Sequence, residues 1–221
     1  MNEYTYGNPW LNDTSTSNKK ISIKKYKYFI FLNSSIRGPF LTPYFIEALL
    51  QINQRYYWYS IFTQRINKDV KLVGCTISCE TTPHVQTYIF ATDFIGLSIL
   101  MKPGIWGASL EDGLFGCYPT KDHASLYSEM PTSNRILESG YMIDSLLTKY
   151  QTVNFSEPHN RNCNRNKNPY KDKHLDDISL EPYEVVFVKF NDLEFLKDPR
   201  DRAKLYQRWS EDTNNANRSI W

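Results

Sequence analysis

Hydrophobic residues fall into short runs separated by polar turns, and the runs alternate between strand-like and helix-like patterns. The run Tyr26–Asn33 (YKYFIFLN) is short and apolar enough for a strand buried on both faces. The turn-forming residues Asn33-Ser34-Ser35 end it. Thr42 and Pro43 then suit the cap and first position of a helix that continues to Leu50. Strand, polar turn and helix in this order place ligands at the carboxyl end of a strand.

The middle of the chain continues the alternation. Lys71–Ser78 and His84–Phe90 predict two further strands, and Gly74 marks a point of close backbone approach in the first of them. A helix over Asp93–Met101, capped by Thr92, follows.

The last third adds two more strand and helix patterns and a long polar segment. In order, the pattern predicts a helix over 125–139 capped by Gly140, a strand over 141–143, a helix over 144–150 capped by Asp144, a loop over 151–178, a strand over 183–190 and a charged helix over 192–211. Strands alternating with helices predict an α/β fold with a mostly parallel mixed sheet flanked by helices. We expect a polar lead-in over 1–25, one domain over 26–190, and a charged helix and tail over 191–221.

Charge and hydropathy exclude several classes of protein. The chain has 26 Lys+Arg against 24 Asp+Glu, a formal net charge of +2, which argues against a dedicated nucleic-acid binder. Hydrophobic residues make up 41% and charged residues 23% of the 221 residues, so a disordered chain or a coiled coil is not expected. No apolar window is long enough for a membrane-spanning helix, and the first residues lack the order of a secretory signal. The expected compartment is therefore the cytoplasm.

The four cysteines support the same compartment. Cys75, Cys79, Cys117 and Cys163 are too few and too scattered for a disulfide framework in a chain of this length. No second pair follows Cys75 and Cys79 at zinc spacing. The pattern favours buried, reduced thiols.

The candidate chemistry rests on weak constellations, because no Walker loop, GxGxxG, HExxH, CxxC or GxSxG motif occurs. Asn33-Ser34-Ser35 can donate to phosphate or sugar hydroxyls at a strand end, and a plain turn explains the same residues equally well. Glu129, near the start of a predicted helix, either complements the helix dipole or acts as a general base. His84 either lines the same crevice or is structural. His174, with acidic neighbours, matches no fixed metal-binding template.

Five blocks in order carry a family resemblance. They are YFIFLNSSIRGPF (28–40), KLVGCTISCE (71–80), HVQTYIFATDFIGLSIL (84–100), SEMPTSNRILESGYMIDSLLTKY (128–150) and NPYKDKHLDDISLEPYEVVFVK (168–189). As a set, covering roughly residues 26–190, they resemble the C-terminal half of glycosyltransferase-like proteins of the rhamnan-synthesis type, which are related to family 2 glycosyltransferases with the type A fold.

The resemblance implies a donor side and a catalytic base. In that fold an Asp-x-Asp motif holds a divalent metal, Mn or Mg, against the nucleotide-sugar diphosphate. The matching positions here, Asn33, Ser34 and Ser35, carry no carboxylate, and Arg37 can supply positive charge instead. Glu129 matches the acidic motif of the acceptor-side helix, so it is the expected base for an inverting, in-line attack on the anomeric carbon.

The resemblance also implies an acceptor side and a missing half. His84, Gln86 and Asp93 are expected near the acceptor pocket, and Trp106 is expected to stack on a sugar ring. The nucleotide-binding region of the fold, about 100 residues, does not fit before Tyr26, so either it is absent and the chain is inactive, or a partner supplies it. The alternatives are a non-catalytic carbohydrate- or protein-binding module and, less favoured, a single-stranded RNA binder using Lys24–Lys27.

Overall fold

The computed structural model describes residues 23–53, 57–102, 114–169, 171, 173–189 and 197–218. Its strands are β1 (Tyr28–Leu32), β2 (Ile36–Arg37), β3 (Val70–Gly74), β4 (Ile77–Ser78), β5 (His84–Val85), β6 (Ile89–Asp93), β7 (Met142–Ser145) and β8 (Val188–Lys189). Its α-helices are α1 (Pro43–Asn53), α2 (Ser60–Thr63), α3 (Phe94–Leu100), α4 (Lys121–Ala124), α5 (Met130–Glu138), α6 (Pro182–Val185) and α7 (Lys197–Arg218). A π-helical segment, Ser125–Glu129, joins α4 to α5. None of the helices in these ranges is long and apolar enough to cross a membrane.

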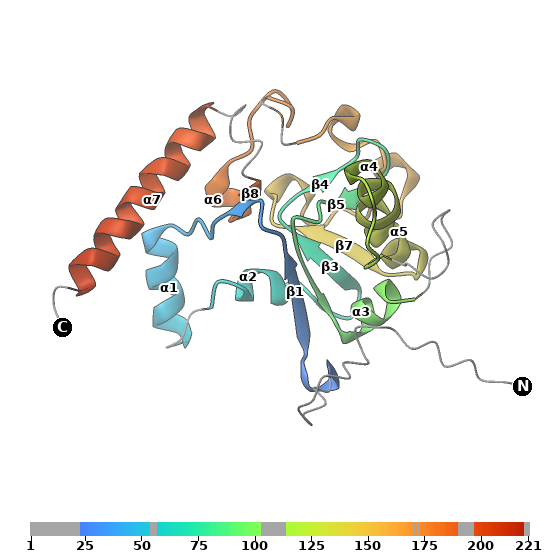
Figure 1. Cartoon of the computed structure of the whole chain (residues 1–221), viewed down its shortest axis with the longest axis horizontal. Helices are drawn as coiled ribbons and strands as arrows, with labels where there is room; N and C mark the ends of the chain where they lie inside the picture. Colours follow the sequence, from blue (N-terminus) through green and yellow to red (C-terminus); the bar gives the residue numbers. More distant parts are fainter. Residues whose placement is uncertain are drawn as a thin grey trace, which may run out of the picture.

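A four-stranded sheet in the order β1-β6-β3-β7 forms the centre of the molecule. β6 runs antiparallel to both β1 and β3, while β3 and β7 are parallel. Two small sheets, β2-β8 and β4-β5, lie beyond the ends of β1 and β3 (Figure 1). Helices and a mixed sheet agree with the predicted α/β class. The mostly parallel pairing is corrected to a mixed one, because β6 inserts between β1 and β3 in the opposite direction.

Strand β1 is an edge strand, not the interior strand that its hydrophobic run predicts. Among the described residues it pairs with β6 alone, and Leu32 is 55% exposed. Its side chains on both faces are still half-buried against the core, which explains the apolar run. The Phe31 ring stacks on Phe90 with a centroid distance of 4.8 Å, and Phe115 packs against it at 5.3 Å.

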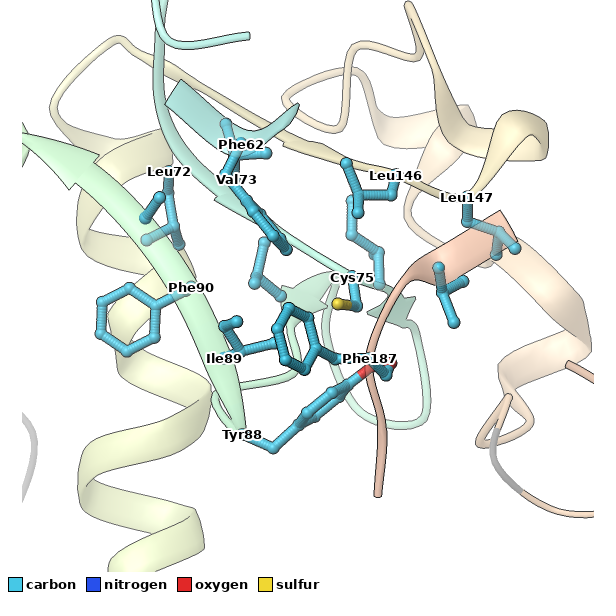
Figure 2. Packing of buried hydrophobic residues seen from close by; sticks show 14 of the residues in the cluster. Phe62, Leu72, Val73, Cys75, Tyr88, Ile89, Phe90, Leu146, Leu147 and Phe187 are labelled. Atoms are coloured by element: carbon cyan, nitrogen blue, oxygen red, sulfur yellow. The ribbon is translucent and has the colours of Figure 1, made fainter. Parts of the chain in front are cut away.

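The core lies around β3, whose Leu72 and Val73 are fully buried. Figure 2 shows the Cys75 thiol beside Phe187, close to Tyr88. The Tyr88 hydroxyl donates to the Phe187 carbonyl oxygen at 3.2 Å, which ties the C-terminal part of the domain to the start of β6. Burial raises the pKa of the Cys75 thiol, so this cysteine remains a protonated core residue.

Segment 183–190, predicted as one strand, instead contains α6 and the short strand β8. Pro182 suits the first helical position, and the Glu181 carboxylate accepts a hydrogen bond from the Tyr183 N–H at 3.4 Å. Val186 leaves the helix with φ of 67°. Val185, Val186, Phe187 and Val188 are all buried, which explains why their hydrophobicity suggested a strand.

Several predicted boundaries also move. The strands expected over 71–78 and 84–90 are each interrupted by a turn, giving β3 and β4, then β5 and β6. The cap of α3 is Asp93, not Thr92, because Asp93 Oδ1 accepts from the Gly96 N–H at 2.9 Å. Asp144 lies in β7 and pairs with Arg65 instead of capping a helix.

Other local predictions are confirmed. α1 begins at Pro43, and Gly140 ends α5 with φ of +80°. Gly74 is the expected point of close approach, because a Cβ there would lie 2.3 Å from Val85 Cγ1. The described part of 151–178 contains only 3₁₀ turns and an isolated bridge.

The cysteine prediction is wrong for three of the four residues. Cys79 and Cys163 form a disulfide with a Cα–Cα distance of 5.4 Å, within the range that such a bond requires. Cys117 is exposed, and only Cys75 is a buried thiol. The fold brings Cys163 against β4 across 84 residues of sequence, a pairing that spacing alone does not reveal.

Candidate functional site

The candidate site lies at one end of the central sheet, which we call the site end and define by the last residues of β1, β3 and β7 (Leu32, Gly74 and Ser145) and the first residue of β6 (Ile89). Leu32 pairs with Ile89, and Gly74 pairs with Ser145, so these residues share one end. The small sheet β4-β5 and the start of α5 lie on this side of the sheet (Figure 1). In α/β folds, ligands bind at the carboxyl ends of the strands.

His84, in β5, has the properties of a neutral hydrogen-bond acceptor. Its Nδ1 lies 2.7 Å from the Thr82 carbonyl oxygen. A carbonyl oxygen only accepts, so Nδ1 carries the proton and Nε2 is the acceptor nitrogen. Burial lowers the pKa of His84 below its ordinary value of 6.5, while the Thr82 carbonyl and the charges of Glu129 and Glu80 act in the opposite direction. The imidazole is therefore neutral at neutral pH.

Gln86 belongs to a chain of polar side chains beside His84. The Thr76 hydroxyl donates to Gln86 Oε1 at 2.8 Å, and Gln86 Nε2 donates to Asn168 Oδ1 at 3.4 Å. Asn168 Nδ2 in turn donates to Glu80 Oε2 at 3.3 Å. The chain links β4, β5 and the segment that follows Cys163. Asn168 was not a candidate from sequence, since a polar loop rich in asparagine gives no signal for a contact 82 residues away.

Glu129 is brought to the same place by the helix on which it lies. Ser133 Oγ accepts a hydrogen bond from the Val85 N–H at 2.8 Å, which fixes α5 against β5. Glu129 ends the π-helical segment one turn earlier, half-buried, and Ser125 Oγ donates to its Oε2 at 3.3 Å. π-Helical turns are rare and are frequently found at functional sites. Because Glu129 immediately precedes α5, the Val85–Ser133 bond places it on the helix that packs against the strand of His84.

The expected donor-side residues form a compact turn at the same end of the sheet. Asn33 Oδ1 accepts from both the N–H and the hydroxyl of Ser35, at 3.0 and 2.7 Å. The Asn33 N–H donates to the Tyr88 carbonyl oxygen at 3.0 Å, two residues from Gln86. Ser34 is exposed, and the exposed Arg37 lies in β2 opposite Val188.

Asp93 does not join the residues expected around it. It lies at the opposite end of β6, where its carboxylate caps α3 and forms a 2.6 Å ion pair with the buried Lys71. We call this the ion-pair end. A groove of about 390 Å³ opens there, and Lys27, Tyr28 and Phe94 are among its lining residues. Trp106 lies outside the described residues.

A metal centre finds no support in the described ranges, which contain no cluster of three or more His, Cys, Asp and Glu side chains. The expected Mn or Mg would have only amide and hydroxyl oxygens at Asn33, Ser34 and Ser35, a donor set without the carboxylates that usually hold such ions. His174 Nδ1 is buried without a hydrogen-bond partner, and its neighbour Asp172 lies outside the described residues.

Comparisons of the chain with protein-family models, with curated proteins and with solved structures found no match. The function is therefore argued from the residues of the site end.

Proposed function

We propose that this chain is a glycosyltransferase-like protein with a type A-related fold, which transfers a sugar from a nucleotide-sugar donor to a hydroxyl of a glycan or glycosylated acceptor. The observation that carries the proposal is that a neutral His84 and the amide pair Gln86–Asn168 lie at the carboxyl ends of β1, β3 and β7, with α5, the helix that Glu129 precedes, fixed against β5. A base beside groups that bind hydroxyls is what activation of a sugar hydroxyl requires.

On the acceptor side, amides suit sugars because each offers both donors and an acceptor. Gln86 and Asn168 are already oriented by Thr76 and Glu80, so their geometry is set before a ligand arrives. Glu129 takes the proton of the attacking hydroxyl, and Nε2 of His84 accepts a hydrogen bond from a neighbouring hydroxyl. The bond from oxygen to the anomeric carbon forms as the bond to the diphosphate breaks, and the nucleoside diphosphate leaves.

On the donor side, the turn after β1 offers neutral groups to the diphosphate. Ser34 and the backbone of the turn can donate hydrogen bonds to phosphate oxygens, but they cannot neutralise the charge of the leaving group. Arg37, four residues after Asn33, is the cation that would do so. A divalent ion arriving with the donor would be held by the diphosphate more than by the chain.

A second function, a non-catalytic carbohydrate-binding module, is favoured by one observation. Asn33 Oδ1 is engaged by two hydrogen bonds from Ser35, so the turn holds itself together and contains no carboxylate. In this alternative the amide pair binds a glycan and no nucleotide sugar is used.

The test is turnover with a panel of nucleotide sugars on glycan acceptors, with and without manganese. Glu129→Gln should lower transfer by roughly 10²–10⁴-fold because the general base is lost. Glu138→Gln is the matched control, since Glu138 is the exposed last residue of α5. Near-normal turnover in Glu129→Gln would remove Glu129 from the mechanism. Glycan binding with no donor turnover and no donor-induced thermal shift in the unaltered protein would establish the binding module.

A further inference from the structure

The Cys79–Cys163 disulfide joins two segments that meet beside the candidate site. Cys79 follows β4 and is 1% exposed, and Cys163 begins a 3₁₀ turn in the irregular part of the chain. Glu80, the next residue after Cys79, accepts the hydrogen bond from Asn168 that extends the Gln86 network. The covalent bond and this polar network therefore hold the same two segments together.

The irregular segment that contains Cys163 (residues 151–178) depends on this disulfide for attachment, because regular secondary structure does little to hold it in place. Among the described residues, eight other than glycine have positive φ, and seven of them lie between Thr152 and Asp177, in a conformation that costs free energy for most side chains. Neither an α-helix nor a β-ladder of more than one bridge stabilises the described part of this segment. Its internal bonds are short-range turn bonds and side-chain bonds such as those of Asn164, whose amide donates to the Lys167 carbonyl oxygen and accepts from the Asp176 N–H.

We propose that Cys79–Cys163 is a permanent structural disulfide, that the protein matures in an oxidising compartment, and that the bond is what keeps Asn168 against Gln86. The expected cytoplasmic location rested partly on four reduced thiols. Cys79 and Cys163 are joined in a disulfide, so they no longer support it. Disulfides persist in oxidising compartments and are rare in reducing ones. In forming the bond, the two thiols release two protons and two electrons, which reduce the disulfide of an exchange protein to a dithiol.

The first test reads the covalent state of the full chain and does not depend on the proposed function. The chain is produced once by export into an oxidising compartment and once in a reducing cytosol, and each product is alkylated under denaturing conditions and mapped by mass spectrometry without reduction. We expect a cross-linked Cys79–Cys163 peptide in the exported protein, with Cys75 and Cys117 alkylated. Alkylation of Cys79 and Cys163 in the exported protein would overturn the proposal.

The second test measures how much the disulfide contributes to the stability of the fold and to the protection of residues 163–180. The double variant Cys79→Ala/Cys163→Ala should lower the melting temperature by on the order of 10 °C, since the bond closes a long loop. Cys117→Ala is the control, because this cysteine is an exposed thiol, and it should leave the melting temperature unchanged. Hydrogen exchange in the double variant should rise over residues 163–180 while the β1-β6-β3-β7 sheet stays protected. Equal stability, or unchanged protection of residues 163–180, would contradict the proposal.

Discussion

The two ends of the central sheet use polar side chains in opposite ways. At the ion-pair end, Lys71 and Asp93 are a cation and an anion 2.6 Å apart, and Lys71 also donates to the Asn67 carbonyl oxygen. At the site end, the polar groups include the neutral imidazole of His84 and the amides of Gln86 and Asn168, which are joined to each other and to the Glu80 carboxylate by longer hydrogen bonds. At the ion-pair end, the buried Lys71 charge is matched by a partner within the fold, which is what structure requires. The other end keeps groups that can still bind hydroxyls, which is what a ligand requires.

This difference separates residues that look alike in sequence. Asp93 and Glu129 both lie near the start of a helix, and both were candidates for the acceptor side. Asp93 is occupied by Lys71 and by the N–H of Gly96, whereas Glu129 receives a single hydrogen bond of 3.3 Å from Ser125 among those described for its side chain. A carboxylate with its lone pairs already engaged is a poor base. We infer that Asp93 stabilises the fold and that Glu129 is the residue to test for catalysis.

The largest effect on stability is expected from Asp93→Ala. It leaves the buried Lys71 ammonium, whose side chain is 5% exposed, without its counter-charge and removes the cap of α3. Breaking one partner of a buried pair costs about 3–5 kcal/mol in the free energy of unfolding. Denaturant unfolding measures this change, and Asp69→Asn, at an exposed position close by, is the control. A loss below about 1 kcal/mol would mean that the pair does not hold this end together.

An intermediate effect is expected from Gly74→Ala at the site end. The added Cβ would lie 2.3 Å from Val85 Cγ1 and 3.2 Å from the Ile89 carbonyl oxygen. Overpacking of this kind costs about 1–3 kcal/mol and should displace β5, and with it His84. The NMR chemical shifts of the His84 imidazole report the displacement, and denaturant unfolding measures the loss in free energy of unfolding.

Gly140→Ala is the matched control for that substitution. A Cβ at Gly140 meets no atom within 4 Å, but φ there is +80°. It should cost about 1–2 kcal/mol through backbone strain and leave the His84 resonance in place. If both variants move His84 equally, β5 is not positioned by the Gly74 contact.

The smallest effect is a dependence of stability on pH. The pKa of His84 is lowered in the folded protein, so as pH falls through about 6.5 the unfolded chain takes up the proton first. The contribution of His84 to stability is therefore present above that pH and is lost below it. Unfolding free energies measured from pH 8 to pH 5 should fall less steeply in His84→Gln than in the unaltered protein. His159→Gln, at an exposed position, should keep the original slope.

The backbone preferences of individual residues made much of the fold predictable. Pro43 at the start of α1 and Gly140 at the end of α5 act through their own backbone preferences, which the sequence displays directly. The apolar runs also identified β3 and β7. The direction of β6 was not predictable in this way, because a short apolar run fits a parallel or an antiparallel position equally well. The helix α6 was missed for a similar reason, since Val185 at its end and the buried Val186 and Val188 that follow resemble a strand.

The site was only partly predictable because its geometry comes from contacts across the chain. His84 and Gln86 were candidates from sequence because they open a predicted strand, and Glu129 because of its place on a predicted helix. Asn168 and the Cys79–Cys163 bond depend on pairings 82 and 84 residues apart, which no local pattern records. The placement of Asp93 could not be foreseen either, because its partner Lys71 lies on another strand.

Amide chemical shifts on titration with nucleotide sugars and glycans test the central claim most directly, since they report on both ends of the sheet at once. We predict that the changes gather at Gly74, His84, Gln86 and Asn168, with added changes near Asn33 and Arg37 when the nucleotide sugar is present. Lys71, Asp93 and Gly96 should keep their shifts. Changes that gather around Lys71 and Asp93, with the residues of the site end unmoved, would contradict the account.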